Sequence, residues 1–411
     1  MRARVLPPPP PGEGRGGSIS RALILLLVLS APAAITAAPF TPANDNEVVE
    51  RLPASASDPS VRRVESLRKQ LAARPNDSAL RLEIARRYFD LAMAQGDPRY
   101  VGYASAAIAP LAASSANDAQ YWLVKGLVQQ YSHDFKGALD SLAKARELDP
   151  QAVEATAWRS AIHMVQANYD EALSECTRLV PNAHPLHAQG CTAYVQASTG
   201  QLAPAYEALG KALAAAGTVA PELAVWTRTR LAEMAIRLQR WPEAESHFRE
   251  ALAQGVTDQF LLGAYADYLL LQKRPAEVLT LLAGWERSDI LLLRLALAGR
   301  AANDPRAADW ASQLRDRFAA AALRGDRLHE QEAARFELDI EGNPTKAVDL
   351  ATRNYQDQKE PRDAEILMRA ALAAKQPRAA SPAVAWLRTN KYEDPHLAAL
   401  ANRLTTPGAA R

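Results

Sequence analysis

Two cysteines and two histidines lie close together in the stretch CTRLVPNAHPLHAQGC. Cys176 and Cys191 are the only cysteines of the chain, and His184 and His187 lie between them. Side chains at the spacing His184-x-x-His187-x-x-x-Cys191 could act as imidazole and thiolate ligands of zinc, copper or nickel. Cys176 or His163 could be a further ligand. The same cysteines could instead form a disulfide or remain as buried thiols. The choice depends on the elements that carry the stretch.

The segment Ala119–Pro150 indicates how those elements are built. Read as a unit of about 34 residues, it has Gly126 at position 8, Ala138 at position 20 and Leu142 at position 24. Small residues let two antiparallel helices approach closely, and large apolar residues fill the space between them. Pro150 ends the second helix. This segment resembles the tetratricopeptide repeat (TPR), whose helix–turn–helix units stack into a superhelix.

The pattern recurs along most of the chain. A small or apolar residue returns at the position-20 equivalent at intervals of about 34 residues. These residues are Ala104, Ala138, Ala172, Ala205, Ala244, Val278, Ala308, Ala347 and Ala380. The composition, rich in Ala and Leu with 6% aromatic residues, is typical of an all-helical chain. We therefore expect an all-α solenoid of TPR-type helical hairpins, a right-handed superhelix of about nine units.

The N-terminal residues have a different composition. Four arginines precede the apolar run ALILLLVLS and the small-residue tract APAAITAA, an order typical of a secretory signal peptide. An uncleaved signal that anchors the chain in the membrane is the alternative, because the combined run approaches the roughly 20 residues of a spanning helix. The predicted segments are a signal peptide at 1–38, a linker at 39–59, N-terminal TPR-like helices at 60–114, core repeats at 115–285, degenerate TPR-like helices with a cap at 286–404, and a disordered tail at 405–411.

Residues 80–111, 330–361 and 368–387 are similar to an uncharacterised group of exported proteobacterial TPR proteins. That resemblance implies a periplasmic location and supplies no activity. The 48 Lys and Arg residues nearly balance the 46 Asp and Glu residues, so the charge gives no indication of nucleic-acid binding. We also expect no membrane span after signal cleavage.

In TPR proteins the first helix of each unit lines the concave surface through positions 2, 5, 9, 12 and 13. The resemblance therefore implies a groove for a protein or peptide partner, with aromatic anchors and scattered charges. The residues at these positions include Tyr131, Met164, Tyr194, Trp226, Glu233, Arg237, Phe260 and Asp267. Packing between neighbouring units is the alternative role for any one of them.

No motif in the sequence predicts catalysis. The stretch HEQEA begins like the H-E-x-x-H zinc helix, but Ala333 stands where the second histidine is required. We expect a non-enzymatic chain without a cofactor. Two functions remain: an exported scaffold that binds a partner, and a periplasmic metal-binding or metal-delivery protein that uses His184, His187 and Cys191.

The repeat pattern bears on the cysteines. Cys176 falls on the second helix of one unit at position 24, which is normally apolar and buried, and Cys191 falls on the first helix of the next unit. In an oxidising compartment, two cysteines on packed neighbouring helices favour a disulfide. Two buried thiols and a metal site remain the alternatives.

Overall fold

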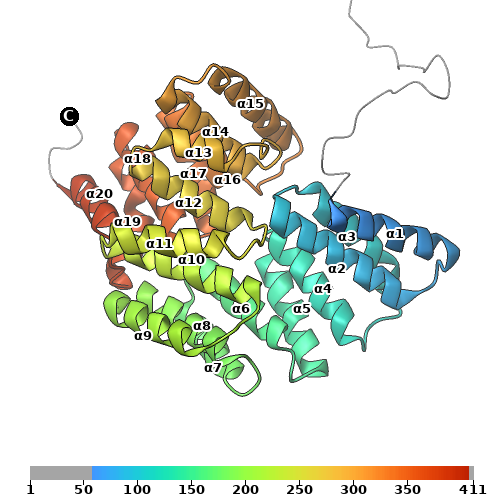
Figure 1. The fold of residues 1–411 in the computed structure, drawn as a ribbon. Helices are drawn as coiled ribbons and strands as arrows, with labels where there is room; N and C mark the ends of the chain where they lie inside the picture. The colour runs from blue at the N-terminus through green and yellow to red at the C-terminus, as the bar shows by residue number, and fades with distance from the viewer. Residues whose placement is uncertain (1–57, 407–411) are drawn as a thin grey trace, which may run out of the picture. The chain divides into compact units, whose positions relative to one another are not determined.

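Antiparallel helical hairpins make up residues 58–406, the part of the chain described by the computed structural model (Figure 1). This range contains no strand. The predicted signal peptide 1–38 lies outside it, as do most of the linker 39–59 and the last residues of the tail 405–411. The nine hairpins are α2 (Ser78–Gln95) with α3 (Arg99–Ile108), α4 (Ala119–Tyr131) with α5 (Phe135–Leu148), α6 (Val153–Val165) with α7 (Tyr169–Leu179), α8 (Pro185–Ser198) with α9 (Leu202–Ala215), α10 (Pro221–Arg237) with α11 (Trp241–Leu252), α12 (Gln259–Leu271) with α13 (Pro275–Leu281), α14 (Asp289–Ala302) with α15 (Ala307–Leu323), α16 (Glu330–Asp339) with α17 (Pro344–Asp357), and α18 (Pro361–Ala373) with α19 (Ser381–Thr389).

Single helices flank this series. Helix α1 (Pro59–Ala73) packs on α2, and α20 (Pro395–Thr405) packs on α18. Two short 3-10 helices, η2 (Ala109–Leu111) and η3 (Pro377–Ala380), follow α3 and precede α19. Within residues 58–406 no helix is both long and apolar enough to cross a bilayer.

Small residues set the distance between the two helices of a hairpin. A Cβ atom added to Gly126 on α4 would lie 2.7 Å from Cγ of Leu142 on α5, so only glycine lets these helices approach this closely. Leu142 and Ala138 are fully buried in the same hairpin. Ala104, Ala172, Ala205, Ala244, Val278, Ala347 and Ala380, at the equivalent position of other hairpins, are also fully buried. The predicted helical-hairpin solenoid is therefore confirmed.

The prediction is wrong for one residue of this series. Ala308 is exposed on α15. Its neighbour Ala307 instead faces Gly299 of α14, where an added Cβ atom would lie 3.0 Å from the Ala307 Cβ atom. Ala311 and Leu314, four and seven residues after Ala307, are the buried residues that continue this face. The contact face of α15 is therefore shifted by one residue, and the Trp310 ring also packs on Gly299, where an added Cβ atom would come within 2.9 Å of it.

A left-handed residue closes the turn of every hairpin. The residues with positive φ at these turns are Gly96, His133, Ala167, Gly200, Gln239, Lys273, Asn303, Gly342 and Lys375. In the eight turns other than that at Gly96, the amide that follows the left-handed residue bonds back into the first helix, as Asp134 N does to Gln129 O at 2.9 Å. This is the Schellman geometry, which satisfies carbonyls that the helix end leaves open.

The C-terminal hairpins also contact units that are far away in the sequence. Lys359 N donates to Val165 O at 2.7 Å, and Trp386 Nε1 donates to Tyr169 Oη at 3.0 Å. In Figure 1 the red α19 lies close to the green and yellow helices of the middle units. We call this set of contacts the closing seam. It comprises His133 with Gln358, Val165 with Lys359, Tyr169 with Trp386, Leu202 with Glu393, and Arg237 with Tyr392 and Glu393.

Candidate functional site

The eight residues expected on the concave face lie on the first helices α4, α6, α8, α10 and α12. They differ in exposure. Met164 and Arg237 are buried, Phe260 is exposed, and the other five are half-buried. What covers each of them shows which part of this face remains accessible.

Arg237, at the end of α10, is held by the closing seam. Its Nη2 donates to Ala197 O at 2.5 Å, and its Nε donates to the backbone oxygen of Glu393 at 2.9 Å. Its guanidinium also lies over the ring of Tyr392, 3.8 Å from the centroid. The sequence placed Arg237 on the binding face, and the structure shows that the chain's own C-terminal segment contacts it there.

Tyr194 and Glu233 form a second cluster with Arg230. The Arg230 guanidinium lies 4.6 Å from the centroid of the Tyr194 ring, and Arg230 Nη1 donates to Glu233 Oε2 at 2.8 Å. Burial raises the pKa of the Tyr194 phenol, and the charges of Glu360 and Arg362 also act on it. Residues just before and within α18 therefore face the same cluster.

Asp267 on α12 is paired with two arginines of later units. Arg294 Nη2 donates to its Oδ2 at 2.6 Å, and Arg335 Nη1 donates to its Oδ1 at 2.8 Å. Burial acts to raise the pKa of Asp267, but these two cations outweigh burial and lower it to about 2. Asp267 is therefore ionised throughout the physiological range and links α12, α14 and α16.

Two of the aromatic and apolar candidates pack between neighbouring units. The Trp226 ring lies against the backbone of Gly190 on α8, where an added Cβ atom would come within 2.4 Å of it. Its edge contacts His187 at 5.8 Å between ring centroids. Met164 belongs to the apolar cluster around Cys176. These contacts give both residues a role in stacking the units.

Tyr131 lines a cavity of about 380 Å³ between the first two hairpins and the loop that precedes α16. Gly102, Val128 and Leu328 contribute apolar or small surface, and His133 lies at the end next to the closing seam. Burial raises the pKa of the Tyr131 phenol. This cavity and the exposed ring of Phe260 are accessible parts of the expected binding face, and the side chains of Glu233 and Asp267 also stay partly exposed.

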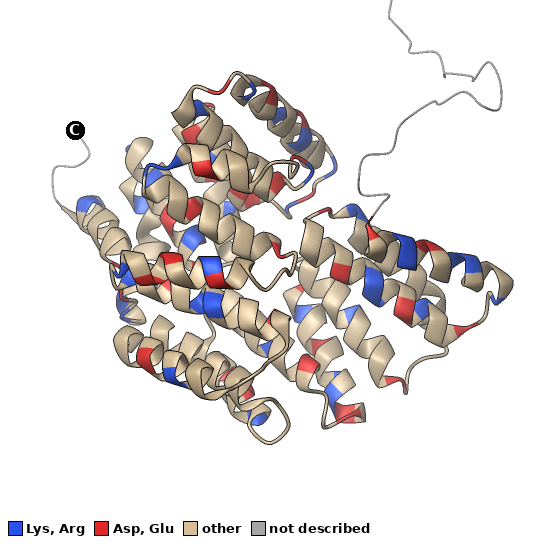
Figure 2. Ribbon diagram, viewed as in Figure 1, with Lys and Arg blue, Asp and Glu red and all other residues tan. Residues whose placement is uncertain are grey.

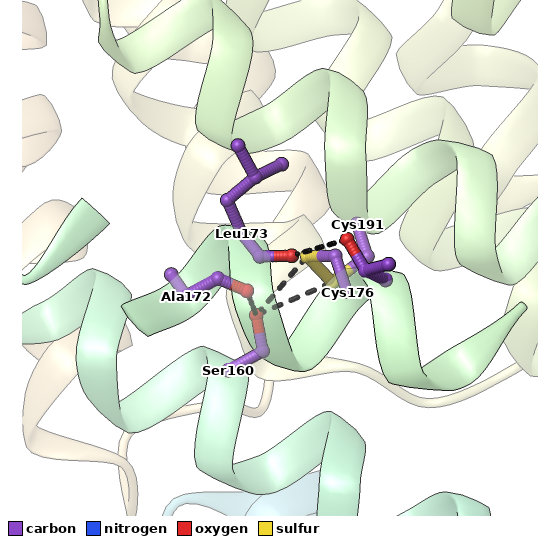
Figure 3. Close-up of a disulfide and its surroundings, with 6 residues drawn as sticks. Ser160, Ala172, Leu173, Cys176 and Cys191 are labelled. Atoms are coloured by element: carbon purple, nitrogen blue, oxygen red, sulfur yellow. Dashed lines mark hydrogen bonds between the residues drawn. A yellow bond between two sulfur atoms is a disulfide. The ribbon is translucent and has the colours of Figure 1, made fainter. Parts of the chain in front are cut away.

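Cys176 and Cys191 form a disulfide, as the repeat pattern favoured (Figure 3). Their Cα atoms are 5.4 Å apart, and Cys176 is fully buried. The Ser160 hydroxyl of α6 lies 3.3 Å and 3.2 Å from the two sulfur atoms, and it also bonds to Ala172 O. The bond therefore joins α7 to α8 at a site where α6 also packs.

The disulfide removes the cysteine ligands of the metal-binding alternative. The Cys191 sulfur is used in the disulfide, so it is not available as a thiolate ligand. His184 lies at the N-cap of α8, where its Nδ1 accepts a hydrogen bond from Leu186 N at 3.2 Å. His187 packs against Trp226. Residues 58–406 contain no other group of three or more His, Cys, Asp or Glu side chains placed to hold a metal ion.

The charged side chains do not gather by sign. Figure 2 shows Lys and Arg interspersed with Asp and Glu along the helices. Many form pairs within or between neighbouring helices, such as Arg274 with Glu245 at 2.8 Å and Arg315 with Glu341 at 2.8 Å. This distribution agrees with the balanced composition.

The sequence did not identify the C-terminal residues of the closing seam, of which Tyr392 and Glu393 contact Arg237 on the expected face. Gln358, Trp386, Tyr392 and Glu393 lie in the degenerate C-terminal region, outside the positions that the repeat assigns to the concave surface. Their partners are far away in the sequence, and a repeat pattern reports only on contacts between neighbouring units.

No protein-family model and no curated protein matches this chain. Similar solved structures include PilW, described as a type IV pilus biogenesis factor, at 18% identity and a TM-score of 0.36 over 59% of this chain and 94% of PilW. A TPR protein from Parabacteroides merdae aligns at 14% identity and a TM-score of 0.33, over 71% of this chain and 98% of its own. Yeast Tom70 aligns at 12% identity and a TM-score of 0.39, over 85% and 86%.

The architecture of residues 58–406 itself defines the class of protein. Nine hairpins with small residues at the crossing, a left-handed turn residue and an apolar core shared with the next unit form a TPR-type solenoid. Proteins of this architecture present extended surfaces built from the first helix of each unit.

Proposed function

We propose that this protein is an exported, non-enzymatic TPR scaffold that binds a protein or peptide partner on its concave face. The observation that carries the proposal is the series of aromatic and charged side chains on the first helices. Of these, the Phe260 ring is exposed and Tyr131 lines a cavity. Aromatic rings at such a surface provide a large contact area at a low cost in side-chain entropy.

The disulfide supports export. A bond between Cys176 and Cys191 persists in the periplasm and is rare in a reducing cytoplasm. The N-terminal sequence carries the order of segments expected of a signal peptide, and we propose the periplasm as the location. A chain that remains anchored by an uncleaved signal is the alternative.

Crosslinking in the native cell envelope, followed by purification of the chain, tests the proposal. Phe260→Asp places a charge on the exposed part of the face, and we expect the crosslinked partner to fall at least about 10-fold. Leu323→Asp is the control because Leu323 is 91% exposed on α15, a second helix that lies outside the expected face. Equal loss of the partner in both variants, or in neither, contradicts binding on the concave face.

Fractionation of the envelope tests the location. The proposal expects a mature chain in the periplasmic fraction that starts between residues 34 and 39, as read by mass spectrometry of its N-terminus. A full-length chain in the membrane fraction supports the anchored alternative.

A further inference from the structure

The loop between α19 and α20 lies on the middle units in the manner of a bound peptide. Glu393 Oε2 accepts a hydrogen bond from Leu202 N, the first residue of α9, at 2.6 Å. The backbone oxygen of the same Glu393 accepts from Arg237 Nε at 2.9 Å. Lys391 packs on Gly200, where an added Cβ atom would lie 3.0 Å from the Lys391 Cβ atom.

Arg237 is held by the middle units as well as by this loop. Its side chain is anchored by the carbonyl of Ala197 at the end of α8, and only 9% of the residue is exposed. This anchor leaves Nε and one face of the planar guanidinium directed at the loop, where they meet a carbonyl and the Tyr392 ring. A planar guanidinium is suited to both contacts at once.

The start of α9 requires an external hydrogen-bond acceptor. Its N-cap residue Gln201 makes no side-chain bond to the first turn, so the amides there lack a local partner. The carboxylate of Glu393 takes this place and also interacts favourably with the positive end of the helix dipole. Arg237 and the first turn of α9 thus accept an aromatic ring followed by a carboxylate.

The loop is held by few apolar contacts on this side. Lys391 and Glu393 are exposed, whereas Tyr392 packs on Trp386 inside the C-terminal apolar cluster. The contacts across the closing seam are mostly hydrogen bonds and a cation–π contact, to which Ala167 and Gly200 add van der Waals contacts. Interfaces of this polar kind within one chain allow relative motion of the parts that they join.

We propose that Arg237 and the first turn of α9 are a recognition site for a partner segment with an aromatic residue followed by Asp or Glu. The chain's own Tyr392 and Glu393 occupy this site until the partner displaces them. This inference rests on the proposed function, because it names the chemistry of the partner. Since the internal segment is present at an effective concentration of about millimolar, it also sets the affinity that a partner segment must exceed.

The probe is a fluorescein-labelled peptide with the sequence of residues 389–396, TNKYEDPH, and the readout is anisotropy with the purified, disulfide-bonded chain. The Tyr392→Ala/Glu393→Gln variant vacates the site. We expect it to bind the peptide at least about 10-fold more tightly than the wild type. Adding Arg237→Gln should remove this gain, and a peptide with Ala and Gln at the two key positions should not bind.

A second variant keeps the test decisive if the double substitution unfolds the C-terminal hairpins. Glu393→Gln retains the Tyr392 packing and removes only the carboxylate, so it should show a smaller gain that Arg237→Gln again abolishes. A folded variant, judged by its thermal melt, that binds the peptide no better than the wild type overturns the proposal.

The envelope crosslinking experiment separates this inference from the proposed function. A partner that depends on Phe260, together with no peptide binding at Arg237, leaves the scaffold standing and removes the recognition site. Peptide binding that depends on Arg237, without any crosslinked partner that depends on Phe260, leaves the site standing and contradicts the proposed binding face.

Discussion

Two kinds of interface hold this solenoid together, and they differ in chemistry. Neighbouring hairpins share apolar cores, such as the cluster that runs from Leu186 to Phe336 and contains fully buried leucines from consecutive units. The closing seam joins units that are distant in the sequence through hydrogen bonds and one cation–π contact. Apolar burial stabilises each unit on the next, whereas polar contacts that replace bonds to water contribute little net stability.

Because the two interfaces differ, substitutions in each of them should destabilise the protein in a different way. Loss of a core residue should unfold a block of units cooperatively, since each unit contacts its neighbours. Loss of a seam contact should release the C-terminal hairpins while the individual units stay folded. Four predictions follow this contrast from the largest effect to the smallest.

Leu142→Ala should cause the largest loss. Leu142 is fully buried against Gly126, so truncation removes its transfer energy and leaves a cavity, which costs about 4 kcal/mol. Urea unfolding followed by circular dichroism measures the loss. Leu271→Ala, an exposed leucine on α12, is the control and should change the free energy of unfolding by less than about 0.5 kcal/mol. Similar losses in the two variants would contradict the assignment of the core.

Removal of the disulfide should have the next largest effect. Cys176→Ala/Cys191→Ala opens a loop with a sequence separation of 15, which costs about 3 kcal/mol in the chain-entropy model. Non-reducing peptide mapping of the wild type should show the linked pair. The same urea experiment with and without reductant should lower the wild type to the level of the variant and leave the variant unchanged. A wild type that is insensitive to reductant would show that the bond does not form.

The seam contact between Tyr169 and Trp386 should contribute less. A double-mutant cycle with Tyr169→Phe and Trp386→Phe removes the hydrogen bond of 3.0 Å while keeping an aromatic ring at each position, and we expect a coupling energy of about 1 kcal/mol. Hydrogen exchange should rise in α19 and α20 and stay unchanged in α4 and α5. A uniform rise in hydrogen exchange over all helices would mean that loss of this seam contact unfolds the units themselves, as loss of a core residue does.

The smallest effect on stability at neutral pH is expected for His133. Burial, together with the neighbouring His329, lowers the pKa of His133 to about 4, and its neutral Nε2 accepts a hydrogen bond from Gln358 at 2.8 Å. Because the folded pKa lies below the unfolded value of about 6.5, the unfolded state binds more protons between these values. The stabilisation is therefore complete above about pH 6.5 and is lost as the pH falls toward 4.

His133→Asn tests this assignment, since asparagine tolerates the left-handed turn and does not titrate. The variant should lose less stability than the wild type between pH 6.5 and pH 4. Asp363, whose pKa burial and Glu360 raise to about 7, acts in the opposite sense, with stability falling as the pH rises through its range. It is present in both proteins and so cancels in the difference. Parallel pH profiles would contradict the role of His133.

The hairpin fold could be predicted from the sequence because its determinants are local. Gly126, Ala138 and Leu142 report on contacts within one unit, and their recurrence reports on the stack. The same logic placed Cys176 and Cys191 on adjacent packed helices and so favoured their disulfide. It failed at Ala308, because the contact with Gly299 is made by Ala307 and the Trp310 ring instead.

The accessibility of the concave face could not be predicted in this way. The repeat assigns Arg237 to that face, but it contains no information about Tyr392 or Glu393, which reach Arg237 only after all the intervening units have stacked. The small rotation from each unit to the next accumulates along the solenoid and decides which distant units meet.

The sequence alone therefore determined the helical class, the hairpin unit and the joint at the cysteines, because each depends on residues within one unit or in adjacent units. Only the tertiary structure decided that His187 packs on Trp226, and that the C-terminal loop contacts Arg237. The physical reason is the range of the interactions. Helix pairing is encoded locally, whereas the closing seam depends on the geometry summed over many units.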